Sequence, residues 1–98
     1  MRGIVWGLDR PTCNDRLDKL ITQYEFYWRI KPRRIKQSKQ EYEVEFENND
    51  VWRAVVANDS SRGRKCNISL VDERIPYDFI QIIKGCTICP PYHAINYY

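Results

Sequence analysis

Hydrophobic and polar positions follow two different periods along this chain, and the change of period divides it into elements. Gly3 to Leu8 is a short apolar run of strand length. After a break at Pro11 and Thr12, apolar residues recur every three or four positions, which predicts a helix that Pro32 ends. Thr12, three residues before Asp15, is expected to cap its start. The predicted apolar face consists of Leu17, Leu20, Ile21, Tyr24, Tyr27 and Trp28.

A period of two begins at position 41. Apolar Tyr42, Val44 and Phe46 alternate with glutamates at positions 41, 43, 45 and 47, which predicts a half-buried strand with its carboxylates toward solvent. Turn-forming residues occupy positions 48–50, and a second apolar run, Val51 to Ala57, follows them. This arrangement is typical of a β-hairpin.

The second half of the chain predicts one more strand and one more helix. A polar loop, Asn58 to Lys65, leads into Asn67 to Val71, whose apolar residues suit a strand of a parallel sheet. After Pro76, apolar residues at positions 79, 80, 82 and 83 predict a short helix that stops at Gly85. The proline- and aromatic-rich remainder, Cys86 to Tyr98, is expected to be irregular. The pattern therefore predicts one α/β domain over residues 1–98, with the strands at 3–8 and 67–71 parallel.

Charge adds one candidate binding segment. The 98 residues include 16 basic and 13 acidic side chains, a net charge of +3 that permits contact with nucleic acid without requiring it. The one dense basic cluster spans Arg29 to Lys39, and we expect either a solvated connection or a nucleic-acid contact there. Trp28 and Trp52 are candidates for base stacking, with core packing as the alternative. The candidate contacts are Arg29, Lys31, Arg33, Arg34 and Lys36.

The cysteines suggest a reducing compartment and a candidate metal site. No apolar run approaches the roughly 20 residues of a membrane span, and no signal peptide is evident, so we expect a cytoplasmic protein. Cys86, Cys89 and His93 form C-x-x-C-x-x-x-H, a spacing that suits zinc with Cys66 or Cys13 as the fourth ligand. The alternative is that these are small apolar thiols and a surface histidine.

Two adjacent carboxylates, Asp72 and Glu73, end the apolar run that begins at Cys66. Charges at the end of a buried strand are costly unless they are paired or functional, although many strands also end in acidic turns. The run from Phe46 to Glu73, with its hairpin, its S-R-G loop and its V-D-E strand end, resembles the ATPase domain of phage terminase large subunits. These are the motors that package DNA into capsids. Ile4 to Tyr27 and the segment after Glu73 are similar to the flanking parts of that domain.

The resemblance implies a fold and specific roles. It implies part of a P-loop NTPase-type parallel sheet with an inserted β-hairpin and two helices, in which Asp72 helps to hold Mg²⁺ and Glu73 orients water against the γ-phosphate of ATP. Arg62 would contact phosphate from the loop that enters the strand. Double-stranded DNA and the other subunits of the packaging motor are the implied partners, and the host cytoplasm is the implied location.

The chain also departs from this family. No G-x-x-x-x-G-K-[ST] segment occurs in the 98 residues, and the nuclease domain of the family is missing. We therefore expect a truncated or partial ATPase that begins after the phosphate loop and hydrolyses little or no ATP alone, with open sheet edges that favour self-association. The alternative is a small phage-encoded protein that binds DNA, a motor or a host factor, with or without a structural zinc ion.

Overall fold

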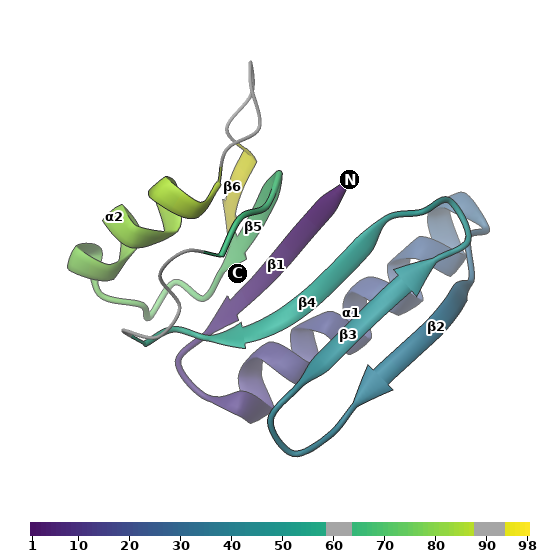
Figure 1. The fold of residues 1–98 in the computed structure, drawn as a ribbon, viewed down its shortest axis with the longest axis horizontal. Helices are drawn as coiled ribbons and strands as arrows, with labels where there is room; N and C mark the ends of the chain where they lie inside the picture. The colour runs from purple at the N-terminus through teal and green to yellow at the C-terminus, as the bar shows by residue number, and fades with distance from the viewer. Residues whose placement is uncertain (59–63, 88–93) are drawn as a thin grey trace.

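The chain folds into a six-stranded mixed sheet with one helix on each face (Figure 1). The computed structural model describes residues 1–58, 64–87 and 94–98. In chain order the elements are β1 (Arg2–Gly7), α1 (Arg10–Trp28), β2 (Pro32–Gln37), β3 (Tyr42–Phe46), β4 (Val51–Val56), β5 (Ile68–Val71), α2 (Tyr77–Cys86) and β6 (Ala94–Tyr97). The strand order is β2-β3-β4-β1-β5-β6, so the predicted α/β class is confirmed.

The sheet is parallel through β4, β1, β5 and β6 and antiparallel through β2, β3 and β4. The predicted parallel pairing of the first apolar strand with the V-D-E strand is confirmed, because Val5 of β1 pairs with Leu70 of β5. The predicted hairpin is also confirmed, with Asn49 at φ 74° in its turn. The hairpin, which the resemblance implied to be an insertion, does not project from the sheet. It continues the sheet instead, because β4 pairs with β1.

Alternation along the strands sends side chains into two separate cores. The first lies under α1, where Leu17, Leu20 and Tyr24 pack on the inward side chains of β3 and β4. The second lies under α2, where Ile80 and Ile83 pack on the opposite face of β1 and β5. The central strands are therefore covered on both sides, as parallel strands require.

The limits of the first helix differ from the prediction. The helix begins at Arg10, and Asp9 caps it by accepting a 2.8 Å hydrogen bond from the backbone N–H of Thr12. Pro11 fits the first turn because a proline has no backbone N–H, and the backbone N–H groups of the first turn have no partner within the helix. At the other end, Tyr27 and Trp28 are 67% and 59% exposed, so they lie outside the core that the periodicity assigned them to.

Three further expectations were wrong. The basic segment is exposed, but its residues 32–37 form the edge strand β2 and not a connection, because Ile35 and Gln37 pair with alternate residues of β3. Part of the tail expected to be irregular forms β6, which pairs in parallel with β5. The second helix passes through Gly85 and ends at Cys86, with Thr87 as an extended C-cap residue. Pairing with a neighbouring strand decided the first two cases, and the local sequence carries little signal of such pairing.

Candidate functional site at the carboxyl ends of the parallel strands

The sheet has one position where a crevice is expected from topology alone. β1 and β5 are neighbours, yet the helix after β1 packs on one face of the sheet and the helix after β5 packs on the other. In open α/β sheets, ligands bind outside the carboxyl ends of the strands where the connections diverge in this way. Asp9 follows β1 and Asp72 follows β5, so two carboxylates stand at this edge.

Asp72 is almost fully buried, with 3% of its surface exposed, and Arg74 neutralises it. The Arg74 Nη2 atom lies 2.7 Å from Asp72 Oδ2, and Nε lies 3.1 Å from both carboxylate oxygens. The backbone N–H of Arg74 also donates to Oδ1 at 3.0 Å. A carboxylate buried to this degree is stable only with such partners.

The hydrogen bonds from Arg74 hold the pKa of Asp72 below its usual range, although burial acts in the opposite direction. The same contact raises the pKa of Arg74. Hydrogen bonds from Thr12, chiefly, also lower the pKa of Asp9. Both carboxyl groups at this edge are therefore ionised at neutral pH, and Arg74 supplies the positive charge between them.

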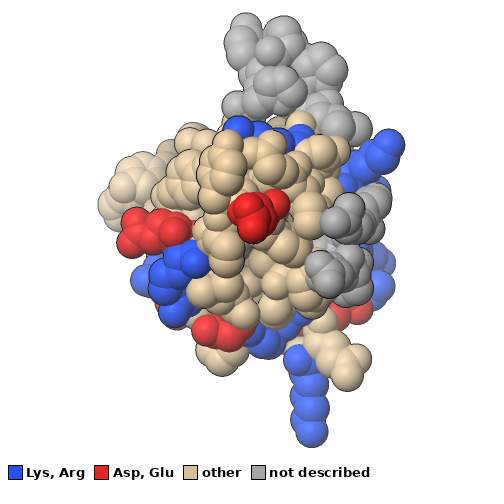
Figure 2. Space-filling view, turned by 90° about the vertical axis from the view of Figure 1, so that its left-hand side faces the viewer, with Lys and Arg blue, Asp and Glu red and all other residues tan. Residues whose placement is uncertain are grey.

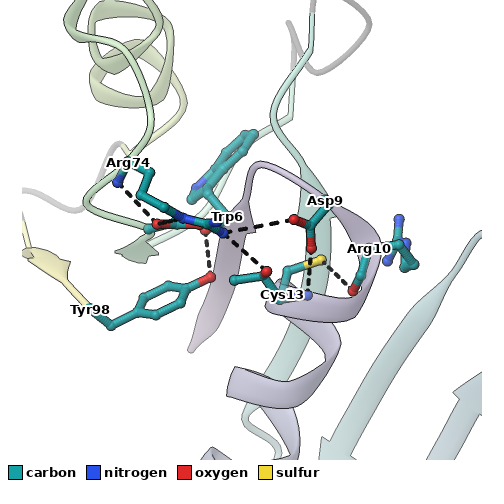
Figure 3. Close-up of polar contacts among 8 residues, drawn as sticks. Trp6, Asp9, Arg10, Cys13, Arg74 and Tyr98 are labelled. Carbon is teal, nitrogen blue, oxygen red and sulfur yellow. Dashed lines mark hydrogen bonds and ion pairs between the residues drawn. The ribbon is translucent and has the colours of Figure 1, made fainter.

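Arg74 links the two strand ends (Figure 3). Its Nη2 atom donates to the Thr12 hydroxyl at 3.1 Å and lies 3.8 Å from Asp9 Oδ2. The half-exposed guanidinium thus joins the first turn of α1 to the turn after β5. Sequence reasoning missed Asp9, Thr12 and Arg74 as members of this site. The available signal was the place of Asp9 directly after an apolar strand, parallel to the strand that precedes Asp72.

Tyr98 lies below Arg74 in the same view (Figure 3). Its hydroxyl donates to the Trp6 carbonyl at 2.7 Å, and its backbone N–H donates to the Val71 carbonyl at 2.9 Å. Burial, more than any neighbouring charge, raises the pKa of this phenol, so it stays protonated and remains a donor. Tyr98 is thereby fixed beside the end of β5.

The sequence also proposed Glu73 and Arg62 for this site. Glu73 is exposed, and its backbone N–H donates to the Tyr98 carbonyl at 2.9 Å. Its carboxylate therefore stays in solvent beside the buried Asp72. Arg62 lies outside the described residues.

The strands β2 and β3 place the residues of the basic cluster in different surroundings. Arg33 donates to Glu45 at 2.7 Å and to Asn49 at 2.6 Å, so its charge is paired. Arg34 and Lys36 lie opposite Glu45 and Glu43 in the register of β2 and β3, on the sheet face away from α1.

The remaining members of the proposed nucleic-acid segment lie between the end of α1 and the start of β2. Arg29 is the left-handed C-cap of α1, and the backbone N–H of Lys31 donates to Glu47. Trp52 does not offer a stacking surface, because it is 3% exposed in the core and its Nε1 donates to the Tyr24 hydroxyl at 2.9 Å.

The proposed zinc ligands fall only partly within the described residues. Cys66 and Cys86 are buried in the core beneath α2, and the Cys66 thiol lies 3.3 Å from the Ser69 hydroxyl. Cys13 belongs to the core on the opposite face, so it does not complete a site with them. Cys89 and His93 lie outside the described residues. Within residues 1–58, 64–87 and 94–98, no group of three potential ligands is close enough to hold a metal ion.

Comparisons of the chain with protein-family models, with curated proteins and with solved structures find no match. In the part of the chain that the structure describes, neither helix has the length and apolar character needed to cross a membrane.

Proposed function

We propose that this chain is part of an ATP-hydrolysing DNA-packaging motor of the terminase type, whose ATPase domain is built on a P-loop sheet. The chain would contribute the strand that is followed by the acidic residues Asp72 and Glu73. The observation that carries the proposal is the position of Asp72. It is a buried, ionised carboxylate directly after a central parallel strand, at the point where neighbouring connections diverge. In ATP-hydrolysing P-loop proteins, an acid in this position helps to hold Mg²⁺ near the phosphates.

The oxygen atoms at this edge suit Mg²⁺. This ion takes one or two carboxylates and completes its shell with waters and substrate phosphates. Asp72, Asp9 and the Thr12 hydroxyl all contact the Arg74 side chain, so the oxygens converge on one positive group. Asp72 and Asp9 would hold the ion, which would supply positive charge to the phosphates of ATP.

Only some of the residues needed to hold and hydrolyse the triphosphate are proposed to lie in this chain. Glu73 is proposed to orient the attacking water, and its exposed carboxylate is free of the ion pair that occupies Asp72. Arg62 is proposed to contact phosphate. Because the 98 residues contain no G-x-x-x-x-G-K-[ST] segment, we expect a separate segment to supply the amide cradle and its lysine.

Translation of the DNA upstream of the Met1 codon tests the proposal. We expect an open frame that encodes G-x-x-x-x-G-K-[ST]. The joined protein should hydrolyse ATP with Mg²⁺, and Glu73→Gln should lower kcat on the order of 100-fold, whereas the 98-residue chain alone should show background hydrolysis. A stop codon and a ribosome-binding site directly before Met1 would overturn the proposal.

The second candidate is a free-standing small binding protein. The observation that favours it is a set of basic side chains gathered on the sheet face opposite α1. A zinc-stabilised form of this candidate requires Cys89 and His93 to join Cys86 and Cys66. Native mass spectrometry should then show one zinc ion per chain that is lost in Cys89→Ser.

A further inference from the structure

The two helices leave part of one sheet face uncovered. α1 lies behind the sheet in Figure 1, and α2 packs on the other face, against side chains of β1, β4 and β5. The side of β2 and β3 that faces the reader in Figure 1 therefore has neither of the described helices over it. It carries two adjoining hollows of about 280 and 140 Å³.

Basic residues from distant parts of the sequence surround these hollows. We call them together the basic groove: Arg2, Arg34, Lys36, Arg53, Arg64 and Lys65. They come from β1, β2, β4 and the segment before β5, so only the folded sheet brings them together. The side of the molecule formed by α2 is different, since uncharged residues dominate it (Figure 2).

The acidic residues of the groove are already neutralised. Glu43 receives a 3.0 Å hydrogen bond from Arg53, and Glu45 receives a 2.7 Å hydrogen bond from Arg33. Among the described residues, the side chains of the other five basic residues of the groove have no ion pair. The groove therefore has an excess of positive charge that the fold itself does not use.

The spacing of these charges suits a repeating anion better than a single one. Lys36 and Arg34 stand on β2, three strands away from Arg2 on β1, which corresponds to roughly 14 Å across the sheet. A single phosphate spans only a fraction of that width. No aromatic side chain lines either hollow in the part of the chain that the structure describes, so base stacking has no platform there.

We propose that the basic groove binds the phosphate backbone of nucleic acid, without selection of base sequence. The inference does not rest on the proposed function, because it uses no residue of the carboxyl-end site. It replaces the sequence segment Arg29 to Lys39 as the unit of recognition. Only Arg34 and Lys36 of that segment belong to the groove, and residues from positions 2, 53, 64 and 65 join them.

Fluorescence anisotropy of the full chain with a labelled 20-base-pair duplex, and with a single strand of the same length, tests this proposal. Arg34→Glu/Lys36→Glu should weaken binding at least tenfold and reduce the slope of log K against log salt by about 2. Arg29→Glu/Lys84→Glu makes the same change in net charge outside the groove, and we expect a clearly smaller loss from it.

Three outcomes would overturn the proposal. The first is an absence of salt-dependent binding by the wild type. The second is an equal loss in both double variants, which would mean that net charge alone attracts the nucleic acid. The third is competition by millimolar inorganic phosphate as effective as that by unlabelled duplex, which would indicate a site for a single small anion. Thermal unfolding of each variant checks that the fold is intact.

Discussion

Charge is used in opposite ways at two regions of this molecule. At the carboxyl-end site, one guanidinium serves two carboxylates, and Asp72 is 3% exposed. At the basic groove, Arg34 and Lys36 are exposed and have no ion pair among the described residues. The first region pairs its charges internally, and the second has basic side chains that no described residue pairs.

This difference predicts how each region responds to substitution. Removing one member of a buried pair leaves a charge without water or a counter-ion, which is strongly destabilising. Removing an exposed charge that makes no ion pair changes stability little and changes the binding of anions instead. Stability measurements and binding measurements should therefore separate the two regions.

Arg74→Met is expected to have the largest effect on stability, because it leaves the Asp72 carboxylate buried without its counter-ion. Arg74 lowers the pKa of Asp72, so the pair stabilises the fold above the unfolded value of about 4, and this contribution is lost as pH falls through the lower folded value. The deficit of the variant should thus be large at pH 7 and should shrink in acid. Denaturant unfolding at several pH values measures it.

Arg34→Met is the matched control for Arg74→Met, since it makes the same chemical change at an exposed arginine of the groove. Asp72→Asn/Arg74→Met should recover part of the lost stability by removing the buried charge. If Arg74→Met and Arg34→Met are equally stable at pH 7, the comparison between the two regions fails.

Tyr98→Phe is expected to have an intermediate effect. It removes the hydrogen bond from the Tyr98 hydroxyl to the Trp6 carbonyl, which costs about 1 kcal/mol for a typical buried bond. The Trp6 carbonyl still accepts a 3.0 Å hydrogen bond from the Asp72 backbone, so the cost should not exceed that value. Chemical denaturation measures the free energy of unfolding. The exposed neighbour provides the control, and a loss in Tyr97→Phe as large as that in Tyr98→Phe would contradict the assignment.

The sequence predicted those parts of the fold whose signal is local. The alternation from Tyr42 to Phe46 and the apolar run before Asp72 identified β3 and β5, because the period of two follows directly from strand geometry. β2 and β6 were missed because their sequences carry no such local signal. β2 is exposed on both faces as an edge strand, so its residues carry no apolar alternation.

The candidate sites show the same limit. Asp72 was found because a carboxylate after an apolar run is visible in the sequence. The contacts of its partner Arg74 with Thr12 and Asp9 arise only when β1 and β5 become neighbours. The zinc hypothesis was built from spacing alone, and the fold separates Cys13 from Cys66 by the thickness of the sheet. The basic groove likewise combines residues that are up to 63 positions apart, Arg2 and Lys65.

Arg34→Gln/Lys36→Gln is expected to have the smallest effect on stability and gives the sharpest contrast with Arg74→Met. Both side chains are exposed and make no ion pair among the described residues, so the change in the free energy of unfolding should stay within about 0.5 kcal/mol. Reduced repulsion among the basic residues should, if anything, favour the folded state, and added salt should remove that small gain. Denaturant unfolding at low and high salt measures both. A loss comparable to that in Arg74→Met would mean that these charges hold β2 on the sheet and are not free for a partner.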